Sequence, residues 1–155
     1  MKPAHFVCIF VQCTWGILQT ALGFCVFLRH IRRPHRIYRG AVVTQWRAPS
    51  SVSLGLFLFL TDAPPKDRRE KNAIPDGEIL KRLLVHEYGH SVQSLLFGPL
   101  YLPLMGLPSA LWGNLPRCKK KRAAGAAYDR FFTERLANYL GEKATGEKAM
   151  KNAVL

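Results

Sequence analysis

The sequence feature that most constrains this chain is the run His86-Glu87-Tyr88-Gly89-His90, which carries the pattern His-Glu-x-x-His. The run lies in a segment with helical hydrophobic spacing, so His86 and His90 point the same way, one helical turn apart. Two imidazoles at this spacing can bind one zinc ion, and Glu87 lies close enough to take a proton from a zinc-bound water. The pattern therefore predicts a zinc site that still needs a third protein ligand.

The third zinc ligand is predicted to be a carboxylate, because the other histidines lie at or beside an apolar N-terminal run. A helix predicted over residues 123–142 offers Glu134 and Asn138, which are four residues apart and share a face. One can bind the metal while the other accepts a hydrogen bond from a ligating imidazole. Asp129 is the competing candidate, on a different face and without such a partner. We therefore predict Glu134 as the ligand, with Asn138 behind it.

The two motifs together resemble those of a known group of enzymes. HEYGH followed by a helix with ERLAN, which begins at Glu134, resembles the Glu-zincin metallopeptidases (gluzincins). ERLAN is similar to the E-x-x-A-D signature of the HtpX-like heat-shock proteases and CaaX prenyl proteases. The resemblance implies that His86, His90 and Glu134 bind zinc and that Glu87 is the general base. Asn138 stands where those families have Asp, and this chain is shorter than theirs. A similar HEYGH…GPLYL…TE…AN pattern occurs in small, uncharacterised bacterial membrane proteins.

The N-terminal residues 4–28 contain no Asp, Glu, Lys or Arg. As a helix this run exceeds the hydrocarbon thickness of a bilayer, and it is long for a signal peptide, with basic residues where a cleavage site should lie. We therefore predict a retained transmembrane helix within an anchor and basic juxtamembrane segment over residues 1–36. Only Lys2 precedes the helix and many arginines follow it, so the N-terminus is expected outside and the rest in the cytoplasm. The predicted location is a membrane, the bacterial inner membrane, with the lipid bilayer as a partner.

The charge of the chain is strongly positive, since 23 Lys and Arg face 10 Asp and Glu, for a net charge of +13. Such an excess suits anionic lipid headgroups or nucleic acid, and membrane topology accounts for part of it. The basic run at residues 117–122 has no interleaved aromatic residues, and the sequence contains no recognisable nucleic-acid-binding motif. We therefore expect no nucleic-acid partner.

Residues 37–46 and 51–60 have the composition of β-strands. Residues 47–50, which include Pro49, resemble a hairpin connection, so we predict a β-hairpin. Towards the end of the second run both faces become apolar, which is typical of a strand that is buried on both sides or touches lipid.

A polar stretch over residues 61–77 is predicted as a loop, and the motif helix is predicted from about residue 77 to 97. The apolar segment 98–113 contains three prolines, which should end or kink a helix. It suits a kinked membrane hairpin, a segment on the bilayer surface or a buried core. Because the helices on either side must meet at one metal, we favour a re-entrant or kinked hairpin.

The predicted fold class is α+β and mainly helical: a transmembrane helix, a β-hairpin, the HExxH helix and a C-terminal helix with the third zinc ligand. Residues 37–142 would form a zincin-like metallopeptidase domain, and residues 143–155 a frayed tail. The predicted function is a membrane-anchored zinc metalloendopeptidase acting on a peptide or protein substrate, with Tyr128 and Arg130 as candidates to stabilise an oxyanion. The alternative is a non-enzymatic membrane protein with a structural zinc site.

Overall fold

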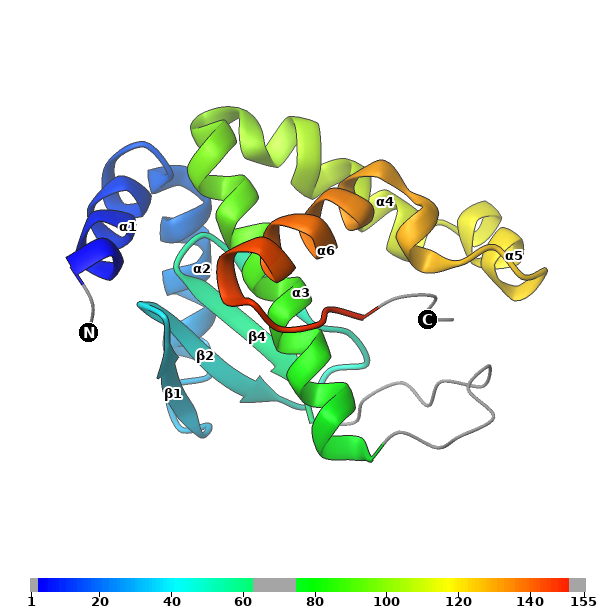
Figure 1. Ribbon diagram of the computed structural model, residues 1–155, viewed down its shortest axis with the longest axis horizontal. Helices are drawn as coiled ribbons and strands as arrows, with labels where there is room; N and C mark the ends of the chain where they lie inside the picture. The colour runs from blue at the N-terminus through cyan, green and yellow to red at the C-terminus, as the bar shows by residue number, and fades with distance from the viewer. Residues whose placement is uncertain (1–2, 63–74, 151–155) are drawn as a thin grey trace.

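The computed structural model describes residues 3–62 and 75–150 and shows a mainly helical α+β protein with a small four-stranded sheet (Figure 1). This confirms the coarse part of the predicted fold class, an α+β and mainly helical protein. Most of the loop predicted over residues 61–77, and residues 151–155 of the predicted tail, lie outside the described residues. The helices and strands in chain order are α1 (Pro3–Thr14), α2 (Ile17–Arg29), β1 (His35–Tyr38), β2 (Ala41–Trp46), β3 (Val52–Leu54), β4 (Phe57–Thr61), α3 (Asp76–Phe97), η1 (Gly98–Leu100), η2 (Leu102–Gly106), α4 (Leu107–Asn114), α5 (Pro116–Ala123), η3 (Tyr128–Arg130) and α6 (Phe132–Thr145).

The N-terminal apolar run forms two helices, so the single helix predicted over residues 4–28 is wrong. Helices α1 and α2 meet at a 95° bend, and within the described residues no single helix has the length and apolar character needed to cross a membrane. Helices α1 and α2 are long and apolar enough to cross a membrane only when their lengths are combined across the bend. The bend has a tertiary cause. Gln12 and Gln19, on either side of it, both hydrogen-bond to the Ser94 hydroxyl of α3, and a straight helix would separate them by about 10 Å.

The sheet has the strand order β1-β2-β4-β3, and its central strands β2 and β4 run parallel, with Val43 opposite Leu58. The single hairpin predicted through residues 47–50 is therefore wrong. Each predicted strand instead folds back on itself through a two-residue turn. Arg39 and Gly40 have φ angles of 49° and 91°, and Gly55 has 61°. Such positive angles suit tight hairpin turns and explain why a glycine lies in each of these turns.

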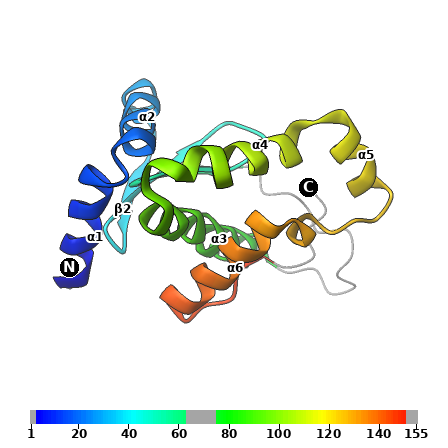
Figure 2. The same ribbon diagram turned by 90° about the horizontal axis from the view of Figure 1, so that it is seen from above.

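Strand β4 is buried on both faces, which confirms the first of the two alternatives for this run. Leu58 and Leu60 pack in one cluster with Leu83, Leu84 and Tyr88 of α3. On the opposite face, the Phe57 ring lies near the rings of Phe24 and Phe27 of α2. The sheet thus lies between α2 and α3, and α6 covers the other side of α3 (Figures 1 and 2).

Helices α3 and α6 cross at very short range, because glycines lie at the crossing. A Cβ on Gly89 would overlap the Ala137 carbonyl oxygen, and a Cβ on Gly141 would overlap the Val85 carbonyl oxygen. This close crossing brings the first turn of α6 against the HExxH motif. The motif helix itself, predicted from about residue 77 to 97, is confirmed as α3.

The helix predicted over residues 123–142 is interrupted. Helix α5 ends at Ala123, Gly125 has a φ of 106°, and the turn η3 precedes the start of α6 at Phe132. Helix α6 then extends past the predicted end to Thr145. The next residues pack on the domain as far as they are described: Ala149 is buried.

After α3 the chain turns at Gly98, which has a φ of 52°, and continues through η1 and η2 into α4. Figure 2 shows this segment passing above α3 towards α5. The segment is buried on one side, through Tyr101 and Met105, and exposed on the other. It therefore forms a cover beside the motif helix.

Candidate metal centre

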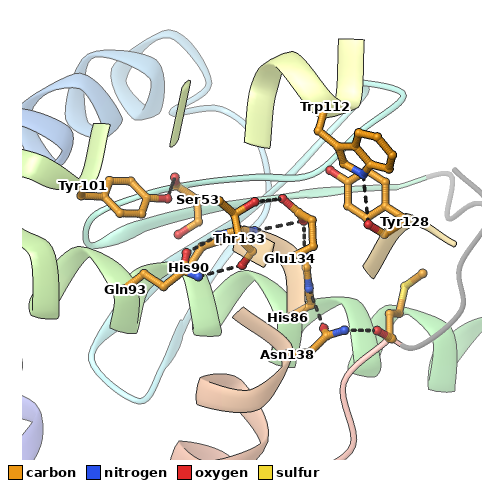
Figure 3. A network of polar contacts seen from close by, with 11 residues as sticks. Ser53, His86, His90, Gln93, Tyr101, Trp112, Tyr128, Thr133, Glu134 and Asn138 are labelled. Carbon is orange, nitrogen blue, oxygen red and sulfur yellow. Dashed lines mark hydrogen bonds and ion pairs between the residues drawn. The ribbon is translucent and has the colours of Figure 1, made fainter. Parts of the chain in front are cut away.

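The three predicted zinc ligands come together at one point (Figure 3). His86 and His90 point from α3, and Glu134 points from the first turn of α6. Glu134 Oε2 lies 3.2 Å from His86 Nε2 and 3.4 Å from His90 Nε2. The three possible ligand atoms lie within 4.8 Å of one another, and all three side chains are buried.

The orientation of the His86 ring is set by Asn138, the residue predicted to lie behind the ligands. His86 Nδ1 lies 2.7 Å from Asn138 Oδ1, and Asn138 Nδ2 donates to the Met150 carbonyl at 2.6 Å. Because a carbonyl can only accept, the amide nitrogen must face Met150 and the amide oxygen must face the ring. His86 therefore carries a proton on Nδ1 and, when neutral, presents a lone pair on Nε2.

His90 is held in the same way by Gln93, a residue that the sequence analysis missed. His90 Nδ1 lies 2.8 Å from Gln93 Oε1, and Gln93 Nε2 donates to the Thr133 carbonyl at 2.8 Å. The Thr133 hydroxyl in turn donates to Glu134 Oε1 at 3.0 Å. Gln93 thus connects His90 of α3 to Thr133, the residue that precedes Glu134. Gln93 could have been found from the sequence, because it is three residues after His90 and therefore lies on a nearby face of the helix.

If both rings are neutral, three acceptors converge without a hydrogen between them. Both neutral rings would direct Nε2 lone pairs at Glu134 Oε2, which is buried and accepts no hydrogen bond among the described residues. Such an arrangement is repulsive unless a cation lies at the centre or a ring takes up a second proton. Two imidazoles and one carboxylate form a group that can hold a divalent metal ion, and zinc is one ion that such a ligand set fits.

The pKa values in the metal-free protein also indicate that this site favours a positive charge. Burial opposes protonation of His86, but the Glu134 carboxylate outweighs it and raises the pKa of His86 to about 9. Burial alone would raise the pKa of Glu134, yet the two histidine rings hold it well below its usual range. A proton on His86 thus takes the place of a metal ion.

Glu87, the predicted general base, lies in the cleft beside the trio. Its side chain is buried and lines the same cleft as His86 and His90. Burial raises the pKa of Glu87, although the two neighbouring rings oppose this shift. A carboxyl group with a raised pKa is better suited to accept and return a proton near neutral pH.

The cleft beside the trio has a volume of about 700 Å³. Its walls are the motif helix, the edge strand β3, and the cover formed by residues 98–114. Tyr101 and Tyr128 also line it, and burial raises the pKa of both hydroxyls, so both remain neutral hydrogen-bond donors. Tyr128 was a predicted oxyanion candidate, whereas Tyr101 was not anticipated.

Two other predicted residues lie outside the trio. Arg130 is exposed and is not among the residues that line the cleft. Asp129, the competing ligand candidate, lines a small adjoining pocket of about 90 Å³ together with Asn138. It is absent from the group of convergent ligand atoms.

Comparison with known proteins gives no relative for this chain: no protein-family model, curated protein or solved structure matches it. The resemblance to Glu-zincin peptidases therefore remains a prediction from the two motifs, and the side-chain geometry described above is what bears on function.

Proposed function

We propose that this chain is a zinc metallopeptidase that hydrolyses peptide bonds. The observation that carries the proposal is the convergence of His86 Nε2, His90 Nε2 and Glu134 Oε2, three buried atoms that can each bind a metal ion. These residues would hold the metal, and three protein ligands leave a coordination position for water. A zinc ion there would act as a Lewis acid that lowers the pKa of water and polarises a peptide carbonyl.

The remaining chemistry belongs to side chains of the cleft. Glu87 would accept the proton of the attacking water and return it to the leaving amine. The hydroxyl of Tyr128, or that of Tyr101, would donate a hydrogen bond to the oxygen that becomes negative in the transition state. Both tyrosines line the cleft with Glu87, and both keep their protons at neutral pH.

The substrate is proposed to bind as an extended peptide. Strand β3 is at the edge of the sheet, and Val52, Ser53 and Leu54 line the cleft with the HExxH residues. An edge strand has main-chain groups on its outer side that can pair with an added strand. The Ser53 carbonyl accepts from the Tyr101 hydroxyl at 3.5 Å, a long contact that a bound peptide would replace. Peptide alignment along β3 would bring a scissile bond beside the metal centre.

The test is a comparison of full-length, zinc-loaded wild type with Glu87→Gln on a mixture of unstructured peptides. Peptide cleavage should fall about a hundredfold or more, with the bound zinc unchanged, because the variant lacks only the base. Glu78→Gln is the matched control, since Glu78 lies on the same helix and pairs with Arg82 outside the cleft. Undiminished cleavage by Glu87→Gln would refute the proposal. If the wild type binds one zinc ion per chain but cleaves no peptide, the result would favour the alternative of a non-enzymatic protein with a structural zinc site.

A further inference from the structure

The cover over the cleft has an exposed apolar side that packing among the described residues, 3–62 and 75–150, does not explain. Six leucines along it are between 43% and 60% exposed, and we call them the leucine surface: Leu96, Leu100, Leu104, Leu107, Leu111 and Leu115. Their spacing of three or four residues places most of them along one side of the helical turns. Large exposed apolar patches of this kind mark contact with lipid or with another protein.

The same segment has a second side that belongs to the cleft. Tyr101, Leu102, Gly106 and Ser109 line the cavity beside the metal trio, and Leu107 lines its rim as well as belonging to the leucine surface. The cover is a single layer of helical turns (Figure 2). It has the cleft on one side and most of the exposed leucines on the other.

The leucine surface continues onto the bend between α1 and α2. Trp15 lies directly against Gly98, and Gln19 Nε2 donates to the Gly98 carbonyl at 3.0 Å. Around that contact the bent pair exposes further large apolar side chains, including Phe10, Trp15, Ile17, Leu18 and Leu22. Two apolar segments that are distant in sequence thus adjoin at one edge of the molecule.

The charges beside these two segments identify the partner. Every acidic residue of the chain lies outside residues 1–61 and 98–128. Each apolar segment ends instead in exposed cations: Arg29 is the last residue of α2 and Arg32 follows it, and Arg117, Lys119 and Lys120 follow α4. Apolar surface flanked by basic residues and free of acids complements a bilayer with anionic headgroups.

We propose that the leucine surface and the α1–α2 bend form one membrane-facing side, which lies in the surface layer of an anionic lipid bilayer. The basic residues after α2 and α4 contact the headgroups. If the proposed peptidase function holds, the cleft lies directly beneath this side, and its substrates are peptide segments held at the membrane surface.

The experiment measures the surroundings of single positions in the full-length chain. Cys8, Cys13, Cys25 and Cys118 are replaced by alanine, and one new cysteine carries an environment-sensitive fluorophore at Leu104→Cys. The protein is added to vesicles of three parts phosphatidylcholine to one part phosphatidylglycerol, with or without spin-labelled lipid. The matched control is Arg135→Cys, because Arg135 is exposed on α6.

At position 104 we expect a blue-shifted emission and quenching by spin-labelled lipid several-fold stronger than at position 135. Equal exposure of both labels to aqueous iodide would overturn the proposal. If the label at position 104 stays accessible to iodide in the presence of vesicles, the leucine surface would instead bind another protein.

A second measurement avoids the cysteine replacements and uses tryptophan fluorescence of the wild-type chain. Vesicles containing brominated lipid should quench it, and Trp15→Phe should remove most of the quenched component, since Trp15 is 52% exposed at the bend. Absence of quenching contradicts the proposal. Glu87→Gln should leave both lipid signals unchanged, so a failure of the peptidase proposal and a failure of the membrane proposal are distinguishable.

Discussion

Gly89 of the HExxH motif lies directly against the carbonyl group of Ala137 in α6, with no room for a side chain between the two helices. This contact sets the distance between the helix that bears both histidines and the helix that bears Glu134. The metal centre therefore depends on a residue that offers no ligand and no proton.

Gly89→Ala should separate α3 from α6, because the new methyl group would overlap backbone atoms that cannot rotate away. We expect a loss of stability of about 1–3 kcal/mol and a large loss of zinc affinity. Urea unfolding and competition with a chelator measure the two effects. Gly77→Ala is the control, since Gly77 lies on the same helix with open space around it. Alanine there should be neutral or should stabilise the helix by about 0.5–1 kcal/mol. Normal zinc affinity in Gly89→Ala would show that the crossing does not position Glu134.

Gln93→Leu should weaken zinc binding by about 10- to 100-fold, because His90 loses the acceptor that fixes its tautomer. The variant also leaves the Thr133 carbonyl without the donor at 2.8 Å, which should cost about 1–3 kcal/mol of stability. Chelator competition at a temperature where the variant is fully folded separates the two effects. The matched control is Gln12→Leu, since Gln12 is also buried and bonds to Ser91 and Ser94 of α3 rather than to a histidine. It should lose stability without a selective loss of zinc.

Asn138→Asp restores the acid found at this position in the peptidases that the motif resembles. A carboxylate accepting from His86 Nδ1 should make the ring a stronger base, so zinc should bind at least as tightly as in the wild type. Asn138→Leu, which has no acceptor, should bind zinc about 10- to 100-fold more weakly. Equal zinc affinities in the two variants would show that Asn138 does not act through His86.

Zinc affinity should depend on pH, because the metal binds the neutral His86 ring and must displace its proton. With a pKa of about 9 in the metal-free protein, apparent affinity should rise about tenfold per pH unit below pH 9 and level off above it. Calorimetry in two buffers with different ionisation enthalpies should detect the released proton at pH 7. Affinity that is constant between pH 7 and pH 9 would contradict a protonated His86 in the metal-free site.

The stability of the metal-free protein should also fall with rising pH. The folded pKa of His86, about 9, is above its ordinary value of 6.5, so the folded state binds the proton more tightly than the unfolded chain. The resulting stabilisation is complete below pH 6.5 and is lost as pH rises through 9. Urea unfolding of chelator-treated protein across this range measures it. Glu134→Gln should flatten the dependence, since it removes the carboxylate that raises this pKa.

Short-range spacing in the sequence was enough to identify the metal trio. His86 and His90 share a face because a helix repeats every 3.6 residues, and the same rule pairs Glu134 with Asn138 four residues later. The burial of β4 on both faces also followed from local pattern, since Phe57, Leu58, Phe59 and Leu60 leave no polar face.

Only the tertiary structure decided the features that depend on partners distant in sequence. The bend between α1 and α2 arises because Gln12 and Gln19 bond to α3, more than seventy residues away. The parallel pairing of β2 with β4 is likewise a non-local choice, which composition and turn residues do not specify. Residue spacing selected the ligands, but the contact of Gly89 with Ala137 brought them within reach of one metal ion, because no local rule sets the distance between two helices.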